Sequence, residues 1–150
     1  MALDFCLYTL NSTRIKTSPR IFLVEDDIDD QELLEDAMHG ISPSIVLVSF
    51  MYGRKFIEEL ENTASESLPQ LIILDYNIPE INGVELLRYL KGKSRYEHIC
   101  KVIWSTSSSA QFKTDCLALG AKDYIVKPSN FADMRVLAQT FLSFCNAHDS

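Results

Sequence analysis

The sequence predicts an α/β protein in which five parallel strands form one doubly wound sheet. Three observations carry this prediction: five short apolar runs, a helical spacing of apolar residues after each run, and the strict alternation of the two patterns. Such β-α alternation is typical of parallel sheets, because each crossover returns the chain to the same end of the sheet and lays a helix against one face. A length of 150 residues fits one such domain, which is large enough to bury a core.

The apolar runs predict the strands. The first four are continuously apolar rather than alternating, as expected for strands that are covered on both faces. The fifth run is shorter. The expected strands are residues 21–25, 45–50, 71–75, 102–105 and 124–126.

Apolar residues three and four positions apart predict one helix after each strand. Gly40 and Gly120 follow the first and fourth of these patterns, which predicts that both helices end there. Residues 1–18 are expected to be an arm or linker, residues 19–147 the folded domain and residues 148–150 a tail. The five patterns are Leu33, Leu34, Ala37 and Met38; Phe56, Ile57 and Leu60; Val84, Leu86, Leu87 and Leu90; Phe112, Cys116 and Leu119; and Phe131, Met134, Ala138, Phe141, Leu142 and Cys145.

The composition indicates a cytoplasmic protein. A net charge of −7 argues against nucleic acid and anionic membranes as partners, and no apolar run approaches the ~20 residues of a membrane span. The four cysteines have none of the spacings of a zinc site, so we expect reduced thiols and a reducing compartment.

Charged residues follow the predicted strands, where open parallel sheets bind their ligands. Asp26 and Asp27 follow the first strand, Asp75 ends the third and Lys127 follows the fifth. If the first and third strands are neighbours, three carboxylates meet in one crevice, and their repulsion favours protonation or a bound cation. A site of oxygen ligands alone suits Mg²⁺. The next acids, residues 29 and 30, are interpreted as solvated groups at the N-terminus of a helix.

At these positions the sequence resembles the receiver domains of bacterial response regulators, from about residue 20 to residue 146. The resemblance rests on the segments VEDD, LDYNIPEINGVELL, WSTS and GAKDYIVKPS, which occur in the family's order. Ser105 and Lys127 follow Asp75 by 30 and 52 residues, which are spacings typical of the family. The resemblance implies a flavodoxin-like receiver fold with strand order 2-1-3-4-5 and a stand-alone response regulator of a two-component system or phosphorelay.

The resemblance also implies the chemistry of the site. Asp75 is the expected phosphoacceptor, and a carboxylate of ordinary pKa is already ionised at pH 7 and needs no general base. Mg²⁺ (or Mn²⁺) is expected to be held by Asp26, Asp27, Asp75 and the backbone carbonyl of Asn77. Lys127 is expected to contact the phosphoryl group.

A conformational switch is implied as well. Ser105, where the family usually has threonine, is expected to bond a phosphoryl oxygen, and Tyr124 to follow it inward. The surface of the fourth helix, fifth strand and fifth helix would then change. Pro79 and Gly83 match the loop after the third strand, where Gly83 is expected to relieve a tight backbone. The peptide bond before Pro128 is expected to be cis.

The expected phosphoryl donor is a histidine kinase or a histidine phosphotransfer protein, because His39, His98 and His148 lie apart in the sequence. Output is expected to pass to a downstream protein that the sequence does not identify, from a monomer or weak homodimer. The protein is expected to be no enzyme beyond catalysing its own phosphorylation and dephosphorylation.

Three alternatives stay open. A haloacid-dehalogenase-type phosphatase would need a general acid two residues after the nucleophile, where this chain has Asn77. A flavodoxin-type electron carrier would need a hydroxyl- and glycine-rich loop after the first strand, where this chain has Glu25, Asp26 and Asp27. A pseudo-receiver would be an interaction module without phosphorylation.

Overall fold

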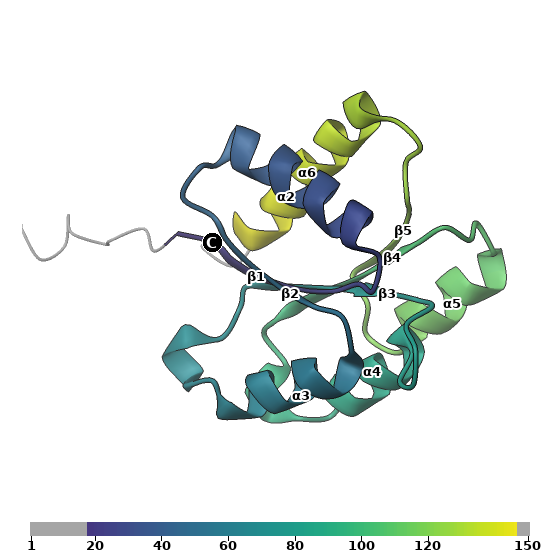
Figure 1. Cartoon of the computed structure of the whole chain (residues 1–150). Coiled ribbons are helices and arrows are strands. Elements are labelled where there is room, and N and C mark those ends of the chain that lie inside the picture. The colour runs from purple at the N-terminus through teal and green to yellow at the C-terminus, as the bar shows by residue number, and fades with distance from the viewer. Residues whose placement is uncertain (1–17, 147–150) are drawn as a thin grey trace, which may run out of the picture.

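Five parallel strands form one sheet in the computed structural model, which describes residues 18–146 (Figure 1). The strand order is β2-β1-β3-β4-β5, as the resemblance implied. Residues 1–17 of the expected arm and the expected tail, residues 148–150, lie outside the described residues. The strands are β1 (Arg20–Val24), β2 (Val46–Phe50), β3 (Leu71–Asp75), β4 (Cys100–Ser105) and β5 (Asp123–Val126).

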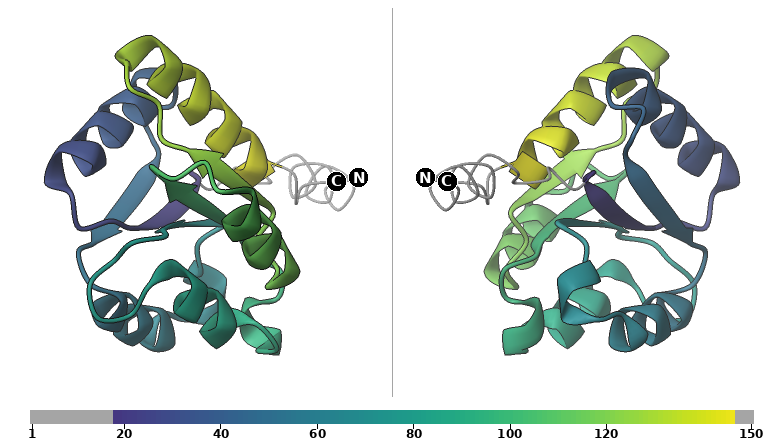
Figure 2. Two further views of the ribbon diagram at one scale, coloured as in Figure 1. Left: turned by 90° about the vertical axis from the view of Figure 1, so that its right-hand side faces the viewer. Right: turned by 90° about the vertical axis from the view of Figure 1, so that its left-hand side faces the viewer.

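Within residues 18–146, five helices cover the two faces of the sheet. Helices α2 and α6 lie side by side on one face, and α3, α4 and α5 lie on the other (Figures 1 and 2). The helices are α2 (Ile28–Ile41), α3 (Gly53–Asn62), α4 (Gly83–Leu90), α5 (Ala110–Ala118) and α6 (Phe131–Asn146). Two short 3₁₀ turns, η1 (Ser65–Ser67) and η2 (Ser94–Tyr96), were not predicted from the sequence.

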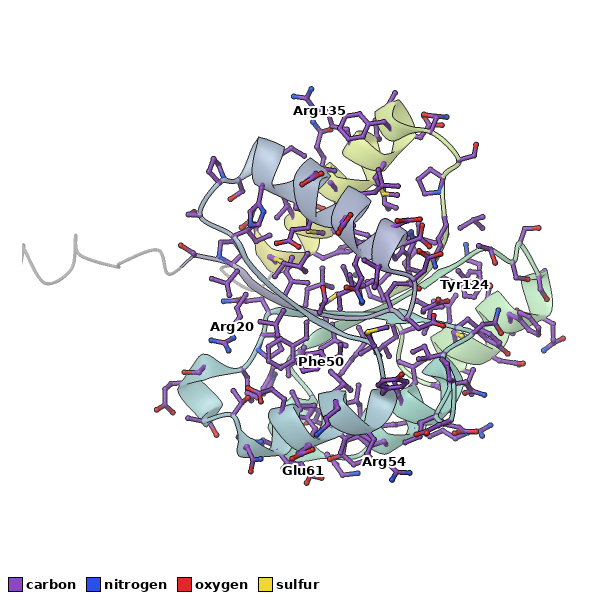
Figure 3. The ribbon with its side chains drawn as sticks, in the orientation of Figure 1. Arg20, Phe50, Arg54, Glu61, Tyr124 and Arg135 are labelled. Carbon is purple, nitrogen blue, oxygen red and sulfur yellow. The ribbon has the colours of Figure 1, made fainter. Side chains whose placement is uncertain are left out.

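Residues that alternate along each strand pack into two separate cores. On the α2 and α6 side, Trp104 meets Phe141 edge to face. On the other side Phe22, Phe50 and Phe56 form a cluster of edge-to-face rings, and Figure 3 shows Phe50 directed from β2 toward α3. The continuous apolar runs of β1, β3 and β4 are buried because helices cover both of their faces.

The second apolar run departs from the expectation. Its strand, β2, is exposed at Val46 and half-buried over its other four residues. The reason is its place at the edge of the sheet, where helices and neighbouring strands surround it less completely.

Two details of the helices also differ from the prediction. Gly40 does not end its helix: α2 continues to Ile41. Gly120 behaves as predicted, since it follows α5 with a φ of +96°, a left-handed conformation that favours glycine. Leu33 and Phe131 were counted in the apolar patterns but are exposed.

Among residues 18–146, no helix has the length and apolar character that a membrane span requires. Three of the four cysteines fall in this range, and Cys100, Cys116 and Cys145 are free thiols. The fourth, Cys6, and one of the three histidines, His148, lie outside it.

Candidate functional site

The strand register brings the predicted functional residues to one edge of the sheet. Val24 lies opposite Leu74, so Glu25, the residue after β1, lies beside Asp75 at the end of β3. Asp75 lies opposite Trp104 in β4, and Ser105 lies opposite Val126 in β5. The carboxyl ends of β1, β3, β4 and β5 therefore meet at this edge.

Three carboxylates converge there. Glu25, Asp26 and Asp75 each offer one oxygen atom, and these oxygens lie within 4.8 Å of one another. Glu25 and Asp75 are buried and Asp26 is half-buried, and such an oxygen-only group fits a hard divalent cation such as Mg²⁺ or Mn²⁺. The structure thus brings together Asp26 and Asp75, and adds Glu25, which the sequence reasoning left out of the site.

Asp27 has a different position from the one expected. Its side chain caps α2 by accepting a hydrogen bond from the backbone N–H of Asp30 (3.2 Å), and it is exposed. Its own N–H donates to Oε1 of Glu25 (3.0 Å). The sequence alone held no signal for this choice among the three acids, because the register of β1 against β3, which places Glu25 beside Asp75, is a property of the folded sheet.

Lys127 lies at the centre of the charged residues, with a side chain only 8% exposed. Its Nζ donates to Glu25 Oε2 (2.5 Å), Asp30 Oδ2 (3.0 Å) and Asp75 Oδ2 (3.2 Å), and lies 4.8 Å from the ring centroid of Trp104. Sequence reasoning treated Asp30 as a solvated acid of the helix terminus, and the structure corrects this, because Asp30 also contacts Lys127.

Burial and the neighbouring negative charges shift the pKa of Lys127 in opposite directions. Burial by itself would lower the pKa of Lys127, but the bonds to Glu25 and Asp30 and the charges of Glu25 and Asp75 raise it above its ordinary value. Burial raises the pKa of Glu25, and the bond from Lys127 offsets this only in part. Lys127 is therefore a cation at neutral pH.

Asp75 is buried and held by its own loop. Its Oδ1 accepts the backbone N–H of Asn77 (3.2 Å), and the N–H of Gly83 donates to the carbonyl of Tyr76 (3.1 Å). A Cβ atom at Gly83 would lie 2.6 Å from the Asp75 carbonyl oxygen. Gly83 therefore allows the expected close backbone contact because it has no side chain. A left-handed backbone conformation is not the reason, since its φ is not positive. Pro79 is exposed two residues after Asn77.

Ser105 is buried and starts a hydrogen-bonded loop. Its Oγ accepts the backbone N–H of Ser107 (3.1 Å), and its carbonyl accepts the N–H of Lys127 (2.7 Å). Tyr124 is buried, and its hydroxyl donates to the carbonyl of Ser107 (2.8 Å). The residues expected to act as a switch, Ser105 and Tyr124, are thus joined through Ser107.

The prediction of a cis peptide bond before Pro128 is wrong for this structure. Every peptide bond between residues 18 and 146 is trans, including the one that joins Lys127 to Pro128. The trans form is the ordinary isomer for X-Pro and is favoured by ~0.5–1 kcal/mol.

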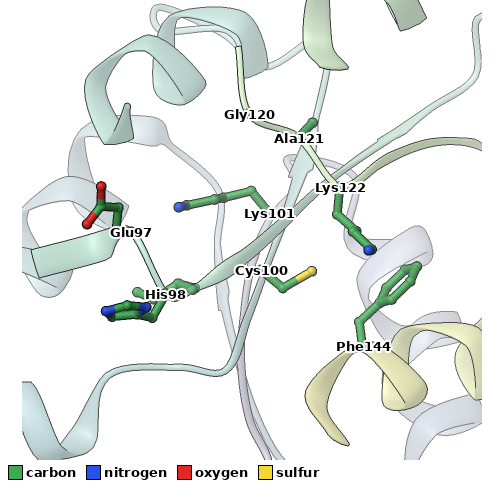
Figure 4. Close-up of a pocket in the computed structure, with 9 residues that line it drawn as sticks. Glu97, His98, Cys100, Lys101, Gly120, Ala121, Lys122 and Phe144 are labelled. Atoms are coloured by element: carbon green, nitrogen blue, oxygen red, sulfur yellow. The ribbon is translucent and has the colours of Figure 1, made fainter. Parts of the chain in front are cut away.

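A surface pocket lies at the other end of the strands, where β4 and β5 begin (Figure 4). It surrounds the beginning of β4 and the residues before β5, and its lining includes His98, Lys101, Lys122 and Phe144. None of the carboxylates described above lines it, so the pocket and the charged site are separate features.

Comparison with known proteins agrees with this geometry. The family described as response regulator receiver domain matches residues 21–139. Two-component response regulator ORR12 of Oryza sativa subsp. japonica is 29% identical over 119 residues, which cover 79% of this chain and 93% of that protein. A protein-glutamate methylesterase/protein-glutamine glutaminase of Treponema denticola is 32% identical over 110 residues, which cover 73% of this chain but 28% of that protein.

Solved structures show the same fold. The phosphorylated cyanobacterial phytochrome response regulator RcpA has a TM-score of 0.78 and 26% identity, with 87% of this chain and 96% of that chain covered. The Mn²⁺-bound form of response regulator Rcp1 has a TM-score of 0.73 and 26% identity, with 84% and 93% covered. From the family match, the relatives and the shared fold, we conclude that this chain belongs to the response regulator receiver domain family of two-component signalling.

Proposed function

We propose that the protein is a phosphorylation switch that accepts a phosphoryl group on Asp75 from a phosphohistidine of a kinase or phosphotransfer partner. The observation that carries the proposal is the contact of the Lys127 ammonium with Asp75 beside two further carboxylates. This arrangement pairs an anionic nucleophile with a fixed positive charge, as phosphoryl transfer requires.

In the transfer step a bond forms between a carboxylate oxygen of Asp75 and phosphorus. The bond from phosphorus to the donor's imidazole nitrogen breaks, and the imidazole leaves with that electron pair. Asp75 needs no general base because it acts as a carboxylate. Lys127 donates to the developing phosphoryl oxygens, and the backbone N–H of Asn77 keeps the Asp75 side chain oriented.

The acidic group explains why a cation belongs to the proposal. Asp26 and Asp75, with Glu25 beside them, would hold Mg²⁺ or Mn²⁺, and the ion would neutralise charge on the incoming phosphoryl group. The backbone carbonyl of Asn77 is a further expected ligand. The sequence predicted Asp27 as a ligand, but its side chain caps α2, and the proposal therefore takes Glu25 in its place.

Phosphorylation would reach the surface through Ser105. A Ser105 hydroxyl that turns to a phosphoryl oxygen gives up the N–H of Ser107, and Ser107 is the residue that Tyr124 holds. The change then reaches α5, β5 and α6, where four large apolar side chains are exposed: Leu117, Val126, Phe131 and Val136. Exposed apolar residues of this kind suit a downstream protein partner.

The proposal is tested by adding acetyl phosphate with Mg²⁺ and measuring intact mass. We expect a gain of one phosphoryl group in the wild type, no gain in Asp75→Asn, and a wild-type gain in the control Asp36→Asn, which removes an exposed acid from α2. Phosphorylation that persists in Asp75→Asn would show that the acceptor is wrong.

This mass measurement and an assay of phosphate release from a phosphate ester test two of the alternatives. A wild type that gains no phosphoryl group under these conditions would favour the pseudo-receiver. Continuous release of phosphate from a generic phosphate ester would favour the phosphatase instead.

A further inference from the structure

Lys127 contacts a carboxylate that comes from a different element than the other two. Glu25 and Asp75 lie at the ends of β1 and β3, whereas Asp30 lies in the first turn of α2. The distance from Lys127 Nζ to Asp30 Oδ2 is 3.0 Å, which is shorter than the 3.2 Å to Asp75. Asp30 is therefore as close to the ammonium as the expected phosphoacceptor is.

The three contacts use the whole donor capacity of the ammonium group. A lysine ammonium has three N–H donors, and Lys127 has three carboxylate acceptors. A phosphoryl group on Asp75 brings additional oxygen acceptors to the same ammonium. The contact with Asp75 can pass to one oxygen of that phosphoryl group, and contact with a second oxygen requires Lys127 to release Glu25 or Asp30.

Burial decides which partner is released most easily. The Glu25 side chain is fully buried, and release of Lys127 would leave its Oε2 without the ammonium donor while the N–H of Asp27 serves only Oε1, which is disfavoured where water cannot enter. The Asp30 side chain is 27% exposed, so water can replace the lysine. Asp30 is thus the exchangeable partner.

We propose that Asp30 is a positioning residue that holds Lys127 in the unphosphorylated protein and competes with the phosphoryl group for its ammonium. This inference rests on the proposed function of Asp75. It implies that the negative charge of Asp30 restrains phosphorylation, and that phosphorylation releases the link between Lys127 and the first turn of α2.

The neighbouring acid supplies a matched control. Asp29 lies in the same first turn of α2 as Asp30, so its negative charge is also close to the positive end of the helix dipole. It is exposed, and the partners of Lys127 are Glu25, Asp30 and Asp75. Any effect of general charge on α2 should appear in both Asp29→Asn and Asp30→Asn, whereas competition for Lys127 should appear in Asp30→Asn alone.

The first test measures the affinity for beryllofluoride with Mg²⁺ through the fluorescence of Trp104, the single tryptophan of the chain. Asp30→Asn keeps an oxygen acceptor but removes the charge, so we expect binding about fivefold tighter than the wild type, which corresponds to about 1 kcal/mol. Asp29→Asn and the charge-retaining Asp30→Glu should bind as the wild type does.

The outcomes separate the inference from the proposed function. If the wild type binds beryllofluoride and Asp30→Asn binds no tighter than Asp29→Asn, the inference is overturned while the proposed function stands. If neither the wild type nor the variants bind, the proposed function fails and the competition at Asp30 fails with it.

A second test needs neither metal nor phosphoryl group. Urea unfolding of the wild type, Asp30→Asn, Lys127→Gln and the double variant, all in EDTA, forms a double-mutant cycle. We expect the shifts of the unfolding midpoint to be non-additive, because each single change removes the same contact. Additive shifts would show that Asp30 does not hold Lys127 and would overturn the inference.

Discussion

Replacing Gly83 by alanine tests how closely α4 approaches the phosphoacceptor. The new Cβ would lie 2.6 Å from the carbonyl oxygen of Asp75, 3.1 Å from Cα of Tyr76 and 3.2 Å from the Asp75 carbonyl carbon. The first distance is well below a normal carbon-to-oxygen contact of roughly 3.3–3.6 Å. All three atoms belong to the backbone, so the clash is relieved only if β3 and α4 move apart.

The magnitude follows from two opposing effects. Forcing extra volume into a packed region typically costs ~1–3 kcal/mol, while alanine in a helix gains ~0.5–1 kcal/mol over glycine. The two ranges combine to a net loss of roughly 0–2.5 kcal/mol, so we expect Gly83→Ala to lower the free energy of unfolding by about 1 kcal/mol. Because the Asp75 backbone moves as well, the affinity for beryllofluoride should fall.

Urea unfolding followed by Trp104 fluorescence measures the change, and Gly40→Ala is the matched control. Gly40 also lies in a helix, its φ is not positive, and an added Cβ would meet no heavy atom within 4 Å. Gly40→Ala should thus stabilise the protein by about 0.5–1 kcal/mol. A Gly83→Ala protein as stable as Gly40→Ala would refute the reasoning.

Three further predictions address the cap, the switch and the thiols. Asp27→Ala removes the N-cap of α2 and should lower the free energy of unfolding by about 1 kcal/mol in urea. Asp27→Asn keeps the cap and should leave both the unfolding free energy and the Mg²⁺ affinity unchanged, the latter measured by metal titration. Weaker Mg²⁺ binding by Asp27→Asn would instead make Asp27 a ligand. Tyr124→Phe removes the bond to the Ser107 carbonyl and should lower the unfolding free energy by about 1 kcal/mol in urea, and no change would mean that this bond adds nothing to the loop. Burial raises the pKa of Cys116 from 9.0 to about 11, so above pH 9 the unfolded thiol loses its proton while the folded thiol keeps it, and the unfolding free energy should fall between pH 9 and 11 by at most about 1.4 kcal/mol per pH unit from this group. A pH slope in Cys116→Ala as steep as that of the wild type would assign the loss to other groups.

The sequence determined the order of strands and helices. A strand that is buried on both faces has a continuous run of apolar residues, whereas a helix that is buried on one face has apolar residues three and four positions apart. All five runs became strands, and β3 has the predicted ends. The edge position of β2 is a property of the assembled sheet, and its run of apolar residues does not reveal how much of each face is covered.

The helix ends show the same division. Gly120 ends α5 as its position suggested, but Gly40 stays helical. Glycine allows the left-handed conformation without requiring it, so the surrounding structure decides whether the chain turns. Leu33 and Phe131 likewise have the right spacing for a core but lie on the exposed side of their helices.

For the site, the sequence by itself determined which residue types stand after each strand: acids after β1, Asp75 at the end of β3, a hydroxyl at the end of β4 and Lys127 after β5. Only the tertiary structure decided which of the acids meet. The register places Glu25 beside Asp75 at the end of β1, and two residues later the chain enters α2, so Asp27 caps that helix. The contact of Asp30 with Lys127 joins residues 97 positions apart, and such a contact exists only once α2 and β5 are packed on the same sheet.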